Sequence, residues 1–217
     1  MHSTSPARIL VADDYPIVRL GIRAMAGMER TFALSVEAES ADAALRTVKS
    51  ADLDLALVDL SFEYGTGLDL VRALHKDAPR LPVLVFSGRD EALFAERSLR
   101  AGARGYIMKQ EPIERLVGAI RHVLAGQIYL SPRMSQRLLE RVSKTATAPE
   151  DRLMALTNRE LEVLEMIGRG LTTAAIAHRL RLSVKTIETY RSNIKTKLGL
   201  KDATELIRCA MTWAEGL

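Results

Sequence analysis

The sequence predicts an α/β domain of (βα)5 type with a doubly wound parallel sheet, followed by a small all-α four-helix domain. Five short apolar runs alternate with amphipathic helical patterns over the first 125 residues. After Gly126 the strand-like runs end, and from Leu156 onward the apolar residues recur only at helical spacing. A chain of 217 residues is also long enough for two modest domains.

The five apolar runs have the length and composition of buried strands. Most are nearly continuous in apolar residues, which is typical of a parallel sheet covered by helices on both faces. The predicted strands are residues 7–13, 32–39, 53–60, 81–87 and 103–109. The helices expected between and after them are residues 16–28, 40–51, 67–77, 90–101 and 112–125. Right-handed crossovers then produce a compact α/β sandwich.

The second half of the chain is predicted to contain a linker and a helical domain. The predicted boundaries are 1–126 for the first domain, 127–152 for a linker with a helix, and 153–217 for the second domain. The linker helix begins near Pro132, and the small polar stretch SKTATAPED follows it. Four helices are expected near 157–169, 172–180, 183–198 and 202–214. Thr157 and Glu160 fit a capping box at the start of the first of these.

Composition excludes several classes of protein. The longest apolar runs are far shorter than the roughly 20 residues of a membrane-spanning helix. The N-terminus lacks the basic start and apolar middle of a secretory signal, so a cytoplasmic protein without membrane contact is expected. The single cysteine, Cys209, fits a small core position. The four histidines are dispersed without the spacing of metal ligands.

Three carboxylates are expected at one end of the predicted sheet. Asp13 and Asp14 end the first strand, and Asp59 ends the third. Ligands of open α/β sheets collect outside the carboxyl ends of the strands, so these acids should converge. A Mg²⁺ ion would relieve their mutual repulsion. Taken singly, each aspartate is better explained as a helix cap that faces water.

Two further strand ends extend this pattern. Ser87 ends the fourth strand and Lys109 ends the fifth. A hydroxyl and an ammonium beside a carboxylate-bound cation can hold the oxygens of a tetrahedral phosphoryl group. Asp59 is then the natural nucleophile, because aspartyl phosphates are a known class of covalent intermediate.

The order of these residues resembles the receiver domain of response regulators, over about residues 7–126. This resemblance implies that Asp59 accepts a phosphoryl group from a sensor histidine kinase. It also implies that Asp13, Asp14, Asp59 and the backbone carbonyl of Ser61 hold Mg²⁺, with Asp13 acting chiefly through water. Ser87 and Tyr106 resemble the paired switch residues, the ring turning inward when the hydroxyl moves toward the phosphate. Without the resemblance, Tyr106 fits a half-buried tyrosine of an edge strand.

The sequence departs from the receiver pattern at a few positions. Phe62 and Glu63 stand where the family commonly has Met and Pro, so a looser loop and a changed Mg²⁺ affinity or phosphoryl lifetime are expected. Gln110 follows Lys109 where many receivers have proline. Ser61 and Arg89 occupy positions at which the family tunes hydrolysis of the phosphoryl group. None of these changes removes a chemical group from the pocket.

The C-terminal helices carry a local excess of positive charge. Seven basic side chains and one acid, Glu188, lie between His178 and Lys201, although the whole chain has a net charge of only +4. Such a stretch fits either a solvated helix face or a nucleic-acid contact. The segment LTNRELEVLEMIGRGLTTAAIAHRLRLSVKTIETYRSNIKTKLGL resembles the LuxR-type helix-turn-helix of NarL/FixJ regulators. The link RLS is the turn of this motif.

The third helix of this domain corresponds to the recognition helix of the family. The resemblance assigns base contacts to Glu188, Thr189 and Ser192. It assigns phosphate contacts on double-stranded DNA to Lys185, Thr186, Arg191 and Lys195. Glu188 is equally well explained by a surface pair with Arg191 or Ser192.

The family resemblance also implies a homodimer when the protein is phosphorylated or DNA-bound, on a DNA site of two half-sites. The last helix supplies the dimer contact in the family, and Leu206, Ile207, Ala210 and Trp213 lie near helical spacing there. Core packing alone would produce the same stripe. The expectation of a dimer is therefore based more on the symmetry of DNA sites than on these residues.

The leading hypothesis is a transcription factor controlled by phosphorylation of Asp59, which is not an enzyme but can catalyse its own dephosphorylation. One alternative is a pseudo-receiver transcription factor that works without phosphate, and the complete set of pocket residues disfavours it. Another is a phosphatase or phosphotransfer enzyme, which leaves the basic helix unexplained.

Overall fold

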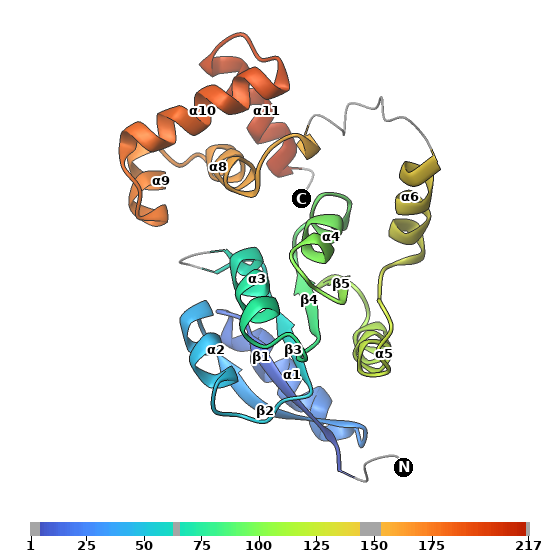
Figure 1. Ribbon diagram of the computed structural model, residues 1–217. Helices are drawn as coiled ribbons and strands as arrows, with labels where there is room; N and C mark the ends of the chain where they lie inside the picture. Colours follow the sequence, from blue (N-terminus) through green and yellow to red (C-terminus); the bar gives the residue numbers. More distant parts are fainter. Residues whose placement is uncertain (1–4, 63–65, 144–152, 216–217) are drawn as a thin grey trace. The chain divides into compact units, whose positions relative to one another are not determined.

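The computed structural model describes residues 5–62, 66–143 and 153–215 (Figure 1). The chain divides into two compact units, Met1–Glu140 and Arg141–Leu217. The first contains a parallel sheet with helices and the second is helical, as the sequence predicted. Glu63 lies outside the described residues, and so does most of the stretch SKTATAPED.

A five-stranded parallel sheet forms the centre of the first unit. The strands lie in the order β2 (Phe32–Ala38), β1 (Ala7–Ala12), β3 (Leu55–Val58), β4 (Val83–Ser87) and β5 (Gly105–Met108). The register places Ala12 beside Val58, and Val58 beside Val85. The residues that follow β1, β3 and β4 therefore meet at one edge of the sheet.

Helices cover both faces of this sheet (Figure 1). They are α1 (Pro16–Met28), α2 (Ala41–Val48), α3 (Gly67–Asp77), α4 (Glu91–Arg100) and α5 (Ile113–Leu124). Apolar side chains of α1 and α5 share one core cluster with β1, β3 and Phe32. Ser40, Thr66 and Asp90 cap α2, α3 and α4 by accepting hydrogen bonds from backbone N–H groups.

The chain leaves α5 along the edge of the sheet. Tyr129 forms a parallel bridge with Gly105 of β5. Helix α6 (Pro132–Ser143) follows and begins at Pro132, as the sequence predicted. Proline suits the first turn of a helix because its missing N–H group has no intrahelical partner there.

The second unit consists chiefly of α8 (Asn158–Gly168), α9 (Thr173–Leu180), α10 (Val184–Leu198) and α11 (Ala203–Glu215). The predicted capping box at Thr157 and Glu160 is present. Buried apolar residues of all four helices include Leu164, Ile176, Ile194 and Leu206. One residue that the sequence placed on an apolar stripe is instead exposed, Ile207 of α11.

The turn between α9 and α10 contains an unusual backbone conformation. Arg181 ends α9 with φ 54°, in the left-handed region. Gly199 ends α10 in the same region, where glycine has no steric penalty. The short turn between α9 and α10 therefore contains a non-glycine residue, Arg181, in a strained backbone conformation.

No helix in the described parts of the chain is long and apolar enough to cross a membrane.

Candidate functional site

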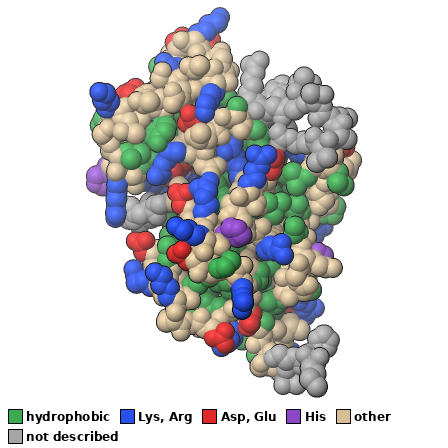
Figure 2. Space-filling view, viewed as in Figure 1, with side chains coloured by type: hydrophobic (Ala, Val, Ile, Leu, Met, Phe, Trp, Pro, Cys, Tyr) green, Lys and Arg blue, Asp and Glu red, His purple; other side chains and the backbone are tan. Residues whose placement is uncertain are grey.

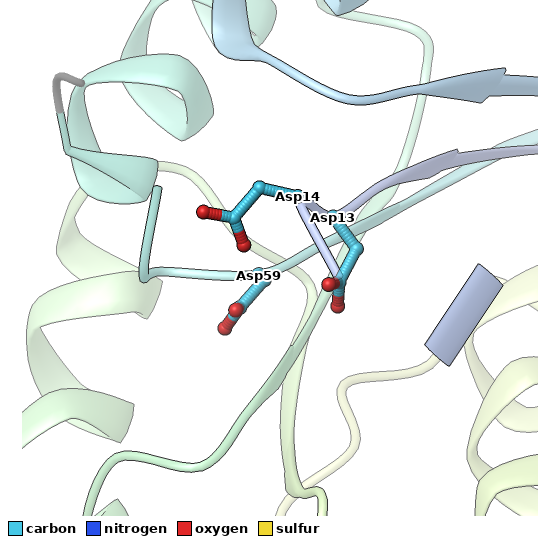
Figure 3. Close-up of side chains that lie close together, drawn as sticks. All are labelled: Asp13, Asp14 and Asp59. Carbon is cyan, nitrogen blue, oxygen red and sulfur yellow. The ribbon is translucent and has the colours of Figure 1, made fainter. Parts of the chain in front are cut away.

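Three aspartates meet at the carboxyl end of the sheet (Figure 3). Asp13 and Asp14 follow β1 and Asp59 follows β3, and one carboxylate oxygen of each lies within 4.8 Å of the others. Asp13 and Asp59 are almost completely buried, and Asp14 is partly exposed. Like charges this close are costly unless a cation accompanies them. Clustered carboxylate oxygens are the donor set that Mg²⁺ prefers, so the site fits this ion.

The ammonium group of Lys109 lies between two of the three carboxylates. Its Nζ is 2.7 Å from Oδ2 of Asp13 and 2.8 Å from Oδ2 of Asp59. Burial lowers the pKa of Lys109, but the charges and hydrogen bonds of Asp59 and Asp13 raise it by more, so it lies above the ordinary value. For Asp13, burial raises the pKa and the pairing with Lys109 only partly offsets this rise.

Backbone groups hold the two buried carboxylates in place. Oδ1 of Asp59 accepts a hydrogen bond of 2.7 Å from the N–H of Leu60. Oδ1 of Asp13 accepts one of 2.9 Å from the N–H of Tyr15. Each of these carboxylates therefore has one oxygen tied to the backbone and the other to Lys109. Oxygens fixed in this way lose little freedom when they bind a ligand.

Gly67 allows the loop after Asp59 to pack directly against the backbone of Asp59 and Leu60. A Cβ atom at Gly67 would overlap the carbonyl oxygen of Asp59 and the Cα atom of Leu60. The N–H of Gly67 also donates to the carbonyl of Leu60 at 3.1 Å. No side chain larger than hydrogen fits here without moving the backbone of Asp59 or Leu60.

Ser87 and Tyr106 lie next to the pocket and are both buried. Ser87 is 0% exposed and Tyr106 is 1% exposed. The hydroxyl of Tyr106 donates a 2.7 Å hydrogen bond to the carbonyl of Arg89. Burial raises the pKa of Tyr106, against the opposing charge of Arg89. The ring is thus fully buried. The alternative interpretation, a half-buried tyrosine of an edge strand, does not fit this burial.

Arg89 reaches back to the loop that follows Asp59. Its Nε donates to the hydroxyl of Ser61 at 3.1 Å, and its guanidinium lies 4.9 Å from the centre of the Phe94 ring. Ser61 also forms an isolated bridge with Thr66. Gln110, which follows Lys109 where many receivers have proline, donates to the carbonyl of Gly88 at 3.4 Å. Sequence reasoning gave no signal for these contacts.

Helix α10 carries all seven residues that the sequence predicted to contact DNA. Lys185, Glu188, Thr189 and Ser192 are exposed, and Thr186, Arg191 and Lys195 are partly exposed. Ser183 caps the helix by accepting from the N–H of Thr186 at 3.1 Å. Glu188 lies 3.8 Å from Arg191 across one turn, a long surface pair. Figure 2 shows Lys and Arg side chains on the visible face of this unit, in the upper part of the view.

A separate cavity of about 1450 Å³ lies at the opposite pole of the first unit and is lined by five arginines. Three of them form ion pairs, Arg8 with Asp52 and Asp54, Arg100 with Glu96, and Arg121 with Glu29. The C-terminal ends of α3, α4 and α5 border this cavity, and their carbonyl groups carry partial negative charge. The protein's own carboxylates and carbonyl groups thus neutralise much of the positive charge of the arginines in this cavity.

Two protein families match this chain. The response regulator receiver domain matches residues 9–121, and the bacterial regulatory proteins of the luxR family match residues 154–210. The first match covers the parallel sheet and the acidic pocket. The second covers the helical unit that contains α10.

Individual relatives match over nearly the full length of the chain. The oxygen regulatory protein NreC of Staphylococcus carnosus is 32% identical over 209 residues, 94% of this chain and 96% of that protein. The Fimbriae Z protein of Salmonella typhimurium is 29% identical over 93% of this chain and 95% of that protein. RcsB of Salmonella enterica, solved on promoter rprA with the phosphomimetic BeF3-, is 25% identical with a TM-score of 0.69, over 94% of this chain and 98% of that one. The chain belongs to the NarL/FixJ family of two-component transcriptional response regulators.

Proposed function

We propose that this regulator accepts a phosphoryl group on Asp59 from a sensor histidine kinase and then binds DNA through α10. The position of Lys109 between Asp13 and Asp59 is the observation that carries the proposal. An ammonium that already bridges two carboxylates can transfer its hydrogen bonds to phosphoryl oxygens. The phosphorylation-independent alternative is not favoured, because every chemical group of the pocket is present.

Mg²⁺ is the cofactor that the acidic cluster fits best. Asp13, Asp14, Asp59 and the backbone carbonyl of Ser61 would hold the ion, with Asp13 acting chiefly through water. The ion would neutralise charge on the transferred phosphoryl group. Asp59 has its Oδ1 fixed by Leu60 and its Oδ2 fixed by Lys109, so the carboxylate is oriented before a phosphodonor arrives.

The transfer itself requires one bond to form and one to break. A carboxylate oxygen of Asp59 forms a bond to phosphorus while the P–N bond to the kinase histidine breaks, and the histidine nitrogen leaves with the electron pair. Lys109 then pairs with the phosphoryl oxygens, and Ser87 hydrogen-bonds another of them. Tyr106 fills the space beside Ser87.

Water must reach the phosphoryl group for the regulator to dephosphorylate itself. We infer that the Arg89–Ser61 hydrogen bond governs this access, because it joins the loop after Asp59 to the loop after Ser87. Arg89→Ala would open the pocket edge and shorten the phosphoryl lifetime. The chain is otherwise not an enzyme.

DNA recognition is assigned to α10. Glu188, Thr189 and Ser192 would read base edges, and Lys185, Thr186, Arg191 and Lys195 would contact phosphates. RcsB bound to promoter DNA supports this arrangement by similarity. Ile207 and Met211 are 43% and 47% exposed on α11, which supports a homodimer on two half-sites.

The working division of the chain follows from these roles. We propose residues 1–126 as the phosphoacceptor domain, 127–152 as the linker and 153–217 as the DNA-binding domain. The kinase phosphohistidine and the DNA meet the protein in the cytoplasm, which is the compartment we propose.

Incubation with Mg²⁺ and acetyl phosphate tests the acceptor. Wild type should gain one phosphoryl group by intact-protein mass spectrometry, Asp59→Asn should gain none, and excess EDTA should abolish the gain. Asp69→Asn, on the exposed surface of α3, is the matched control and should behave as wild type. Equal modification of wild type and Asp59→Asn would refute the assignment.

A further inference from the structure

The segment after α5 is held against the outer edge of β5 by its main chain. The N–H of Tyr106 donates to the carbonyl of Tyr129, and the N–H of Tyr129 donates to the carbonyl of Arg104, both at 3.0 Å. Tyr129 also places its ring 5.9 Å from that of His122 in an edge-on arrangement. The switch residue Tyr106 is therefore in direct main-chain contact with the start of the linker.

The close approach of this segment depends on Gly105. A Cβ atom at Gly105 would lie 2.8 Å from the carbonyl oxygen of Tyr129 and 3.0 Å from its Cβ atom. Any larger residue would push the segment away from the sheet.

A second contact ties the linker to the start of α4. The hydroxyl of Ser131 donates a 2.8 Å hydrogen bond to Oε1 of Glu91. The same Ser131 oxygen accepts from the N–H of Met134 at 3.0 Å and so caps α6. Met134 is itself buried, which anchors the first turn of α6.

Both contacts lead to the loop between β4 and α4. Glu91 is the first residue of α4, two residues after Arg89. The carbonyl of Arg89 accepts a hydrogen bond from the hydroxyl of Tyr106, and the N–H of Arg89 donates to Oγ of Ser87 at 3.4 Å. Residues 87–91 therefore touch the proposed phosphoryl site at one end and the linker at the other.

We propose that Glu91 and Ser131 form a latch that releases the start of α6 when Asp59 is phosphorylated. This inference depends on the proposed phosphorylation of Asp59. When Ser87 turns toward the phosphoryl group, the loop that carries Glu91 shifts with it. A hydrogen bond of 2.8 Å is lost once its atoms separate by roughly another 0.7 Å, so even a small shift opens the latch. The main-chain pairing of Tyr129 with β5 remains, and the release is confined to the first turn of α6.

The latch can be tested by amide hydrogen exchange on the full chain, with and without Mg²⁺ and beryllofluoride. In wild type, the amides of residues 133–136 should exchange about fivefold faster when beryllofluoride is present, which corresponds to a loss of ~1 kcal/mol. Glu91→Ala removes the acceptor and leaves the Ser131 cap in place, so these amides should already exchange at the faster rate without beryllofluoride. Glu91→Gln keeps an acceptor oxygen and should behave as wild type.

The outcomes separate the latch from the phosphorylation proposal. If Glu91→Ala exchanges at the wild-type rate without beryllofluoride, the latch does not exist. Equal loss of protection in Glu91→Ala and Glu91→Gln would mean that the charge of Glu91, not its hydrogen bond to Ser131, matters, and would also overturn the proposal. If Asp59→Asn still takes up a phosphoryl group, the proposed acceptor is wrong, whatever the state of the latch. A wild type whose pocket binds beryllofluoride without any change at residues 133–136 would overturn the latch alone.

Discussion

Lys109 contacts two of the three carboxylates that would hold a bound cation. Its ammonium contacts Oδ2 of both Asp13 and Asp59, so it both neutralises them and competes for them. Removal of the ammonium should separate these two effects.

We expect Lys109→Met to bind Mg²⁺ at least as tightly as wild type, because the competing cation is gone. The same variant should lose most of the DNA-binding response to phosphorylation, since no ammonium pairs with the phosphoryl group. Calorimetric titration with Mg²⁺ and DNA binding with acetyl phosphate measure the two quantities. Lys76→Met, on the exposed surface of α3, is the control. A large fall in Mg²⁺ affinity in Lys109→Met would contradict this account.

Gly67 supports Asp59 through backbone contact alone. Gly67→Ala should lower the free energy of unfolding by about 3 kcal/mol, because its Cβ atom would overlap backbone atoms that cannot move cheaply. Gly118→Ala is the matched control, since open space surrounds its Cβ position in α5 and alanine favours helix by about 1 kcal/mol. Urea unfolding followed by circular dichroism measures both. A Gly67→Ala variant as stable as wild type would show that the loop relaxes freely.

The residues of the pocket were largely predictable from the sequence, because each of its main groups ends a strand. Asp13, Asp59 and Lys109 follow apolar runs, and parallel strands bring their carboxyl ends together. Arg89 was marked only by its position in the receiver pattern, and Glu91 carried no signal, because surface loops contain such residues for many reasons. Their contacts depend on the path of the loop, which periodicity does not determine.

At the level of single elements, the capping box of α8 is tied to α10 by an ion pair. Glu160 accepts from the N–H of Thr157 at 2.7 Å and lies 2.6 Å from Nζ of Lys197. Burial raises the pKa of Glu160, but the hydrogen bonds from Lys197 and Thr157 lower it by more, below the ordinary value. A carboxylate whose pKa is lowered by folding stabilises the protein above its unfolded pKa, and this contribution disappears as the pH falls through the folded pKa.

Glu160→Gln keeps the cap but removes the ion pair. We expect a loss of about 1 kcal/mol or less at pH 7, and a weaker decline in stability than wild type shows as the pH falls below 4.5. Trp213 of α11 is the only tryptophan, so its fluorescence during urea unfolding reports on this unit. Parallel pH profiles for wild type and Glu160→Gln would show that the ion pair contributes nothing.

The helices were predicted well because caps and apolar spacing agree at most of their ends. Thr157 and Ser183 are good N-caps, and both perform this role in the structure. Arg181 was not predictable as a left-handed residue, since glycine or asparagine normally marks that conformation. The bridge between Tyr129 and Gly105 was also missed, because one paired residue leaves no alternating pattern.

Across the whole molecule, positive charge should contribute to DNA binding through released counterions. Lys195→Ala should weaken binding to all DNA sequences alike and reduce the slope of log K against log salt by about 1, if Lys195 contacts a phosphate. Fluorescence anisotropy over a salt series measures this slope, with Lys49→Ala of the first unit as the control. Loss of binding to one sequence only would contradict a phosphate role.

We expect the pairing of Tyr129 with Gly105 to protect the regulator against self-association through this edge of the sheet. It occupies the N–H of Tyr106 and the carbonyl of Arg104 on the outer strand of the sheet. A chain cut after Gly126 would leave both groups open to a strand from another molecule, whereas a chain that ends at Glu140 would keep them covered. Light scattering should therefore show that the shorter fragment aggregates and that the longer fragment is monodisperse. The fourteen residues 127–140, which lie outside the sheet, would then determine whether the β5 edge pairs with another molecule.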